Sequence, residues 1–337
     1  MRLREAGRLR KAGWRCAAGR GARMSGAGEA GGVWVLADPR AGTAAQAQGI
    51  AERLDVPFRV VPLEWGPLAA LPLAWPSLAG LSAAVRAALT PPWPRLVISA
   101  GRRAAPVSRW LRRRGARTVH CMRPGVGAAD FDLLVIGRHD GARPAANVMP
   151  VLGATHRVSP AALARAREEW ASLGALPGPR VALLLGGPVR SAGMDPAAAL
   201  AVLDRVLPGA GSVLATTSRR TGEAAGAALA ARLSGVPGVL HRWGEAGPNP
   251  YAGFLAQADR VVVTADSVSM LSEALATAAP VFVAGELPGA PRHRALLAAL
   301  EGAGQVVPLD RYPAAPPRAP LDESGRVAEA VRARFLV

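Results

Sequence analysis

Short apolar runs recur along this chain, and each is followed by a polar turn and a segment rich in small and apolar residues. Clear examples are residues 33–37, 95–100, 181–185, 212–216 and 259–264. Runs rich in Val and Leu without polar alternation are typical of parallel strands that are covered on both faces. Strands that alternate with helical segments therefore predict an α/β protein built on doubly wound parallel sheets.

The alternation occurs twice, and a helical, Gly/Pro-rich segment separates the two halves. A chain of 337 residues is long enough to bury two separate cores. We therefore expect two Rossmann-like domains that face each other. The predicted organisation is a disordered extension at 1–30, an N-terminal domain at 31–155, a linker helix and Gly/Pro linker at 156–180, a C-terminal domain at 181–312, and a Pro-rich loop with a C-terminal helix at 313–337. Within it, we expect helices at 77–89, with Ser77 as the N-cap, and at 160–173.

The net charge of +17 comes almost wholly from arginine, since 40 of the 41 basic residues are Arg. Together with abundant Ala, Gly and Pro, this bias is typical of a GC-rich genome, so the charge does not by itself indicate nucleic-acid binding. Residues 1–24 supply +7 of the total. The remaining basic body favours anionic ligands or an anionic membrane surface as partners.

Cysteine usage and hydropathy indicate a protein of a reducing compartment. Cys16 and Cys121 are too few for a disulfide framework and lack metal-ligand spacing. The apolar tract at 68–81 contains two prolines and is shorter than the ~20 residues of a spanning helix. We expect a cytoplasmic protein, with peripheral association at the inner membrane as the alternative, and with no metal site and no cofactor.

Polar loops follow three strands of the second half, and parallel strands present their carboxyl ends at one edge of a sheet, where ligands bind. Gly186 and Gly187 follow the first of these strands, and backbone N–H groups at such glycines can approach a phosphate. Ser218, Arg219 and Arg220 follow the second strand, and an Arg fork grips phosphate with two hydrogen bonds. The alternatives are a tight turn for the glycines, and a helix cap at Ser218 beside two solvated arginines.

The third loop is 264–273, with Asp266, Ser267, Ser269 and Glu273 as candidate binding residues. If residues 267–277 form a helix, Ser269 and Glu273 share one face. A carboxylate there can accept hydrogen bonds from both hydroxyls of a ribose. The alternative is that Asp266 or Ser267 only caps the helix.

The corresponding edge of the first half offers acids and a histidine as candidate general bases. They are Asp38, His139 and Asp140. We expect the adjacent side chains of His139 and Asp140 to point apart. We interpret the basic stretch at 109–117 as a solvated helix face, with contact to acidic lipid as the alternative.

Several of these stretches together resemble the mitochondrial fission ELM-type family, which has many bacterial members. The resemblance covers about 33–312 and rests on SAGRR at 99–103, TSRRT at 217–221, NPY at 249–251 and TADSVSMLSEA at 264–274. This family is similar to glycosyltransferases of the GT-B architecture, in which two facing Rossmann-like domains enclose the active site. The resemblance implies that Glu273 holds a ribose and that Gly187, Ser218, Arg219 and Ser267 line a phosphate site. One departure is Ala278, where many members have glycine.

The resulting expectation is a metal-independent glycosyltransferase-like protein that uses a nucleotide-diphosphate sugar as donor. Arg219 or Arg220 would stabilise the leaving diphosphate, and Asp38 or Asp140 would deprotonate an acceptor hydroxyl. Two alternatives stay open: a non-catalytic GT-B-like protein that binds a membrane surface or a protein partner, and a nucleotide-sugar epimerase.

Overall fold

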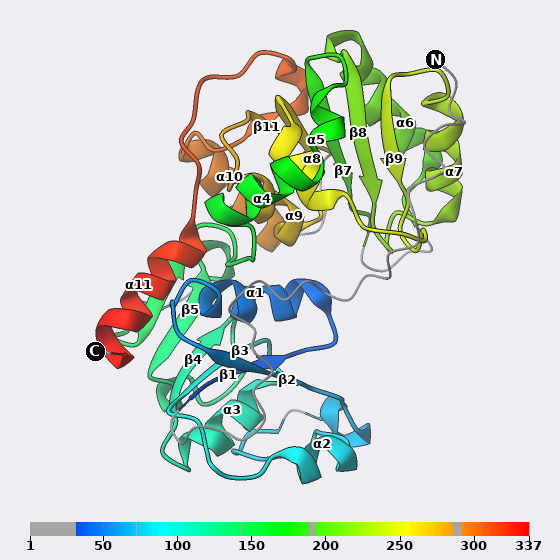
Figure 1. Ribbon diagram of the computed structural model, residues 1–337. Coiled ribbons are helices and arrows are strands. Elements are labelled where there is room, and N and C mark those ends of the chain that lie inside the picture. The colour runs from blue at the N-terminus through cyan, green and yellow to red at the C-terminus, as the bar shows by residue number, and fades with distance from the viewer. Residues whose placement is uncertain (1–31, 72, 142, 189–192, 286–290, 337) are drawn as a thin grey trace.

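A computed structural model describes residues 32–71, 73–141, 143–188, 193–285 and 291–336. Within them the chain forms two parallel six-stranded sheets, one in each half, with helices on both faces (Figure 1). This arrangement confirms the predicted α/β class with two doubly wound sheets. The extension expected at 1–30 and Cys16 lie outside the described residues.

The N-terminal sheet has the strand order β2-β1-β3-β4-β5-β6, and its pairs are parallel. Its strands are β1 (Val33–Ala37), β2 (Phe58–Pro62), β3 (Leu96–Ala100), β4 (Arg117–Cys121), β5 (Leu133–Gly137) and β6 (Val148–Val151). The helices of this half are α1 (Ala41–Ala51), α2 (Ala83–Ala88) and α3 (Ala105–Arg112), with the 3₁₀ turns η2 (Pro67–Ala70), η3 (Ala128–Asp130) and η4 (Arg138–Asp140).

The C-terminal sheet has the order β12-β11-β10-β7-β8-β9 and is also parallel. Its strands are β7 (Arg180–Leu185), β8 (Ser212–Thr217), β9 (Gly238–His241), β10 (Arg260–Thr264), β11 (Val281–Ala284) and β12 (Val307–Pro308). The helices here are α4 (Pro160–Glu169), α5 (Ala171–Gly174), α6 (Pro196–Val206), α7 (Glu223–Arg232), α8 (Tyr251–Gln257), α9 (Val268–Ala274) and α10 (Pro291–Gly302), with the 3₁₀ turns η5 (Leu207–Gly209) and η6 (Leu309–Arg311).

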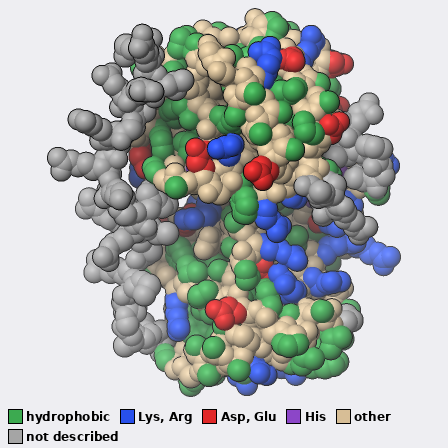
Figure 2. Space-filling view, turned by 90° about the vertical axis from the view of Figure 1, so that its right-hand side faces the viewer, with side chains coloured by type: hydrophobic (Ala, Val, Ile, Leu, Met, Phe, Trp, Pro, Cys, Tyr) green, Lys and Arg blue, Asp and Glu red, His purple; other side chains and the backbone are tan. Residues whose placement is uncertain are grey.

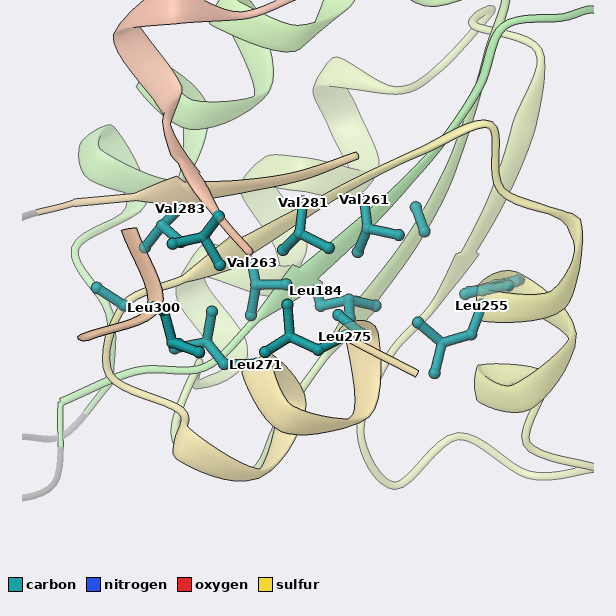
Figure 3. Close-up of a cluster of buried hydrophobic side chains, with 14 of the residues drawn as sticks. Leu184, Leu255, Val261, Val263, Leu271, Leu275, Val281, Val283 and Leu300 are labelled. Carbon is teal, nitrogen blue, oxygen red and sulfur yellow. The ribbon is translucent and has the colours of Figure 1, made fainter. Parts of the chain in front are cut away.

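The C-terminal sheet is buried on both faces, as its uninterrupted apolar strands require. Val261 and Val263 of β10 point to one face, and Val262 points to the other. Figure 3 shows Leu271 and Leu275, from α9 and its end, lying against the first of these faces. This packing fixes the start of α9 at the carboxyl edge of the sheet.

The last helix, α11 (Glu323–Phe335), returns to the N-terminal domain, beside which it lies in Figure 1. Its residues Val327, Ala328 and Val331 belong to the same buried cluster as Ile50 and Leu54 of the α1 region. The chain therefore crosses between the two domains twice, once before α4 and once before α11.

The two crossing segments are bound to each other. The Ser324 hydroxyl accepts the His156 N–H at 2.7 Å and donates to the His156 carbonyl at 2.8 Å. Glu323 accepts the Leu152 N–H at 2.7 Å. Arg53, at the end of the α1 region, donates to the carbonyls of His156 and Val158. These contacts tie both crossings to the N-terminal domain.

Two helix predictions were wrong in their extent. The helix expected at 77–89 begins only at Ala83, and Ser82 is its N-cap, because the backbone at Leu81 pairs with Trp65 in a β-bridge. The helix expected at 160–173 divides into α4 and α5 at Trp170. Among the described residues, no helix combines the length and hydropathy needed to span a membrane.

Candidate functional site

The three polar loops of the C-terminal half lie side by side, because β10, β7 and β8 are neighbours in the sheet. Thr264 at the end of β10 accepts the Gly186 N–H at 2.7 Å, and Asp266 accepts the Gly187 N–H at 2.7 Å. Ser218 donates from its hydroxyl to the Gly186 carbonyl at 3.1 Å. The prediction that these loops share one edge is confirmed, and they interlock through direct hydrogen bonds.

Both glycines are required because neighbouring loops approach their backbone. A Cβ on Gly186 would lie 2.3 Å from a carboxylate oxygen of Asp266. A Cβ on Gly187, whose φ is +152°, would lie 2.1 Å from the Arg220 carbonyl oxygen. The Gly187 N–H, considered in the sequence as a phosphate donor, is bound to Asp266 in this structure.

The two arginines after β8 have different roles. Arg220 forms an ion pair with Asp266 at 3.1 Å and donates to the Gly187 carbonyl at 2.6 Å, so it fastens the loops together. Arg219 is exposed, and it takes no part in the hydrogen bonds and ion pairs that join the described parts of these loops. Of the two guanidinium groups, that of Arg219 is therefore the one available to an anion.

Helix α9 begins at this edge and contacts the other domain. Ser267 is its N-cap, and the Ser267 hydroxyl accepts the Met270 N–H at 3.4 Å. Ser269 lies opposite the start of α1, since a Cβ on Gly42 would be 2.7 Å from its hydroxyl oxygen. One turn later, the Ser272 hydroxyl accepts the Ala154 N–H of the N-terminal domain at 2.9 Å.

Glu273 lies on α9 one turn beyond Ser269. Its carboxylate accepts a hydrogen bond from the Tyr251 hydroxyl of α8 at 2.6 Å. Burial raises the pKa of Glu273 to about 7, although the Tyr251 hydrogen bond opposes this rise. Burial and the neighbouring carboxylate also raise the pKa of Tyr251. Glu273 therefore changes its charge near neutral pH, which was not evident from the sequence.

A cavity of about 350 Å³ lies between the two domains. Its N-terminal wall comes from the start of α1 and from the carboxyl ends of β4, β5 and β6, and its C-terminal wall comes from the starts of α9 and α10. Figure 2 shows arginine side chains, coloured blue, gathered along the hollow between the two halves of the molecule. The residues that carry polar side chains into this cavity are Arg40, Thr43, Gln46, His139, Asp140, Thr155, Ser269, Arg292 and His293.

His139 and Asp140 converge in this cavity, so the expectation that they point apart was wrong. His139 Nε2 lies 3.6 Å from Asp140 Oδ1, because η4 curls the chain here before Gly141 takes a left-handed conformation. Arg292 of α10 donates to the same Asp140 oxygen from Nε at 2.8 Å and from Nη2, which links the two domains.

The imidazole of His139 is neutral and incompletely bonded. Its side chain is 9% exposed, and its Nδ1 atom has no hydrogen-bond partner among the described residues. Burial is the main cause that lowers the pKa of His139; the charges of Arg292 and His293 lower it further, and Asp140 opposes them. At neutral pH, this ring can accept a proton at one of its nitrogens.

Asp38 lies outside the cavity lining and has three donors of its own. Its carboxylate accepts the Arg40 N–H at 2.9 Å, the Trp65 Nε1–H at 3.2 Å and Arg103 Nη2 at 3.2 Å. The guanidinium of Arg103 also lies 4.9 Å from the centre of the Trp65 ring. In this structure, Asp38 shapes the turn that leads into α1.

Two residues near the site were not predicted from the sequence. Arg292 is marked only by its contact with Asp140 of the other domain, which is 152 positions away. Trp243 follows β9, is 63% exposed, and is fixed by a hydrogen bond from its N–H to the Thr217 hydroxyl at 2.9 Å. Its position beside the end of β8 could have been inferred from the strand order. The described residues hold no cluster of three or more His, Cys, Asp or Glu that could bind a metal.

Comparisons with known proteins bear on the family and the fold. Residues 41–335 match the family described as Mitochondrial fission ELM1. The Mitochondrial fission protein ELM1 of Arabidopsis thaliana is 29% identical over 277 residues, which are 71% of this chain and 63% of the plant protein. The match therefore spans less than two thirds of that relative.

Among solved structures, the chain is similar to enzymes from an archaeon and from a bacterium. UDP-GlcNAc 2-epimerase from Methanocaldococcus jannaschii has a TM-score of 0.51 at 12% identity, covering 90% of this chain and 99% of that one. UDP-GlcNAc 2-epimerase from Neisseria meningitidis, solved with UDP-GlcNAc bound, has a TM-score of 0.52 at 13% identity, with the same coverage. At this identity the likeness shows the fold alone, and it confirms the predicted GT-B-like architecture.

Proposed function

The chain belongs to the mitochondrial fission ELM1 family, and on that basis we propose that it is a glycosyltransferase-like protein that binds a nucleotide-diphosphate sugar between its two domains. The observation that carries the proposal is the interdomain cavity, whose walls come from the ligand-binding edges of two separate parallel sheets. The similar enzyme from Neisseria meningitidis, solved with UDP-GlcNAc, supports this choice of ligand.

The donor's diphosphate binds at the three interlocked loops. Arg219 supplies the charge, because Arg220 is already paired with Asp266. A guanidinium that faces the leaving diphosphate stabilises the charge that develops there during transfer. The loops are held rigidly by their mutual hydrogen bonds, so little reorganisation is needed when the diphosphate leaves.

The nucleoside binds farther along the same edge. Glu273, when ionised, accepts hydrogen bonds from the ribose hydroxyls, and Tyr251 holds its carboxylate in place. Trp243 offers an exposed aromatic face beside the end of β8, on which a nucleobase can stack. Neither contact involves the transferred sugar. The sugar is therefore left to face the N-terminal domain.

Transfer itself takes place in the cavity. The acceptor hydroxyl attacks the anomeric carbon of the donor, its proton passes to a nitrogen of His139, and the bond from that carbon to the diphosphate oxygen breaks. His139 suits this role because it is neutral and its Nδ1 has no partner among the described residues. Asp140 stabilises the imidazolium that forms, whereas Asp38 is occupied by its three donors.

Calorimetry of the full chain with a panel of UDP-, GDP- and ADP-sugars tests the donor site. We expect one member of the panel to bind, and Arg219→Ala to weaken it about tenfold or more. Arg232→Ala is the matched control, because that exposed arginine pairs with Asp204 on α6, away from the loops. The proposal fails if no nucleotide sugar binds or if the two variants behave alike. Product analysis then separates sugar transfer, which releases a nucleoside diphosphate, from epimerisation, which does not.

A second candidate function is binding to an anionic membrane surface. Leu68, Leu71 and Trp75 lie in one connection after β2 and are 46%, 55% and 60% exposed. Exposed Trp and Leu residues within one short segment are typical of interfacial membrane contacts. The sequence had suggested the arginines at 112–114 as a contact to acidic lipid. In the structure, Arg112 pairs with Asp132 and Arg114 lies over the Trp110 ring, so both already have partners within the protein.

Vesicle sedimentation tests this candidate. We expect binding to vesicles that contain phosphatidylserine, and loss of binding when Leu68, Leu71 and Trp75 are all replaced by Ser. Val239→Ser is the control, because Val239 is 38% exposed on the other domain. Equal binding by the triple variant and the parent would exclude this surface.

A further inference from the structure

We propose that the start of α1, together with Arg40, forms a second anion subsite beside His139, which takes a phosphate or carboxylate group carried by the acceptor. The assignment to the acceptor rests on the proposed function; the anion subsite itself does not. It lies on the N-terminal wall of the cavity, across from the starts of α9 and α10.

The first argument is the end of α1. A helix start presents backbone N–H groups without intrahelical acceptors and a partial positive charge. In α1 no side chain caps this end, and its first turn contains no acidic residue. Thr43 and Ala44 donate to the Arg40 carbonyl, but no acceptor for the N–H groups of Ala41 and Gly42 occurs among the described residues. Gly42 and Thr43 line the cavity.

The second argument is charge. Arg40 lines the cavity, and its guanidinium joins none of the ion pairs found among the described residues. Asp140 is the acidic residue among the lining residues, and Arg292 neutralises it with two N–H donors. The charge that remains on the N-terminal wall is therefore positive, and it stands beside the uncapped helix start.

The third argument is independent of the helix. The side chain of His139 is nine-tenths buried, lines the same cavity, and leaves Nδ1 without a partner in the described structure. A buried polar atom without a partner costs about 1–3 kcal/mol, so such atoms usually meet a ligand or water. A polar group of a ligand is thus expected within reach of His139.

These three features select an acceptor class. The hydroxyl that reacts lies at His139, and an anionic group of the same molecule lies at Arg40 and the start of α1. The donor does not need this subsite, because Arg219 on the other domain already offers its diphosphate a guanidinium. The acceptor is therefore expected to carry a phosphate or carboxylate close to its reacting hydroxyl.

The test uses inorganic phosphate and glycerol 3-phosphate as probes, titrated into the full chain by calorimetry with and without saturating UDP. We expect both probes to bind in the absence of nucleotide, and glycerol 3-phosphate to bind equally well when UDP is present. Arg40→Ala should weaken both probes about tenfold or more, and it should change UDP affinity less than about twofold. Arg86→Ala is the control, since Arg86 is an exposed arginine at the last turn of α2 in the same domain.

Each outcome decides one part of the proposal. If the parent binds neither probe, or if Arg40→Ala and Arg86→Ala bind alike, the subsite is wrong. If UDP displaces the probes, or if Arg40→Ala weakens UDP as strongly as phosphate, there is one shared anion site and its assignment to the acceptor is wrong. If no nucleotide binds but phosphate binding depends on Arg40, the proposed donor site fails while the anion subsite stands.

Discussion

Replacing Glu273 by Gln tests the electrostatics of the proposed ribose site without any ligand. The Glu273 carboxyl is held by the Tyr251 hydroxyl at 2.6 Å, and burial raises its pKa to about 7. Glutamine has the same shape, keeps an oxygen that can accept the Tyr251 hydrogen bond, and carries no charge. The substitution therefore removes the titration and leaves the packing in place.

The size of the effect follows from the pKa. An ordinary Glu carboxyl titrates near 4.5 in the unfolded chain, so the difference of roughly 2.5 units corresponds to about 3 kcal/mol as an upper value. The folded state binds the proton more tightly than the unfolded state. This contribution to stability is thus fully present below about pH 4.5 and is lost as the pH rises through about 7.

Urea denaturation followed by circular dichroism between pH 4.5 and 8.5 measures this difference. The free energy of unfolding of Glu273→Gln relative to the parent should rise across the range and reach up to about 3 kcal/mol near pH 8. Glu301→Gln is the control, because Glu301 is exposed. If Glu273→Gln and Glu301→Gln show the same pH dependence, the surroundings of Glu273 do not raise its pKa, and its role as a titrating ribose ligand is refuted.

Three further predictions concern the loops, the crossings and the nucleobase. Gly187→Ala should lower the urea midpoint by an amount equivalent to ~2 kcal/mol or more, since its Cβ would lie 2.1 Å from a backbone oxygen of the next loop; an unchanged midpoint would contradict this contact. Arg53→Ala should lower the free energy of unfolding by about 2–4 kcal/mol in the same assay, because backbone carbonyls of the crossing segment lose their hydrogen-bond donor. Replacing the exposed Arg157 by Ala should lower it by less than ~1 kcal/mol. Binding of a nucleotide sugar should quench tryptophan emission in the parent and in Trp75→Phe but not in Trp243→Phe; equal quenching in both variants would remove Trp243 from the site.

The strand pattern was sufficient to predict the edge at which the three loops meet. Parallel strands end on one side of a sheet, so apolar runs followed by polar turns locate their own loops. Local sequence also offered Ser267 as one of two candidates for the N-cap of this helix, and Ser267 is the N-cap of α9. The pattern could not predict that Arg219 stays exposed while Arg220 fastens the loops together. That difference arises because Asp266, in the turn after β10, forms an ion pair with only one of them, and β10 is two places from β8 in the sheet order.

His139 and Asp140 are a second example of an arrangement that local sequence could not predict. Alternation of side chains along an extended chain predicts that His139 and Asp140 point apart, but the chain forms a 3₁₀ turn there and the two converge. The lowered pKa of His139 depends chiefly on burial between domains, which no local pattern reports. The role of Asp38 also depended on Trp65 and Arg103, which are distant in the sequence.

By itself, the sequence determined the two parallel sheets, the position of the polar loops on each sheet, and the family. Those features depend on the spacing of apolar residues and on short motifs, which are local properties of the chain. Only the tertiary structure decided that α11 packs on the N-terminal domain, that Arg292 meets Asp140, and that the start of α1 faces α9 across a cavity. These are contacts between segments up to a whole domain apart, and they form because the two domains pack against each other, an event that no single stretch of sequence encodes.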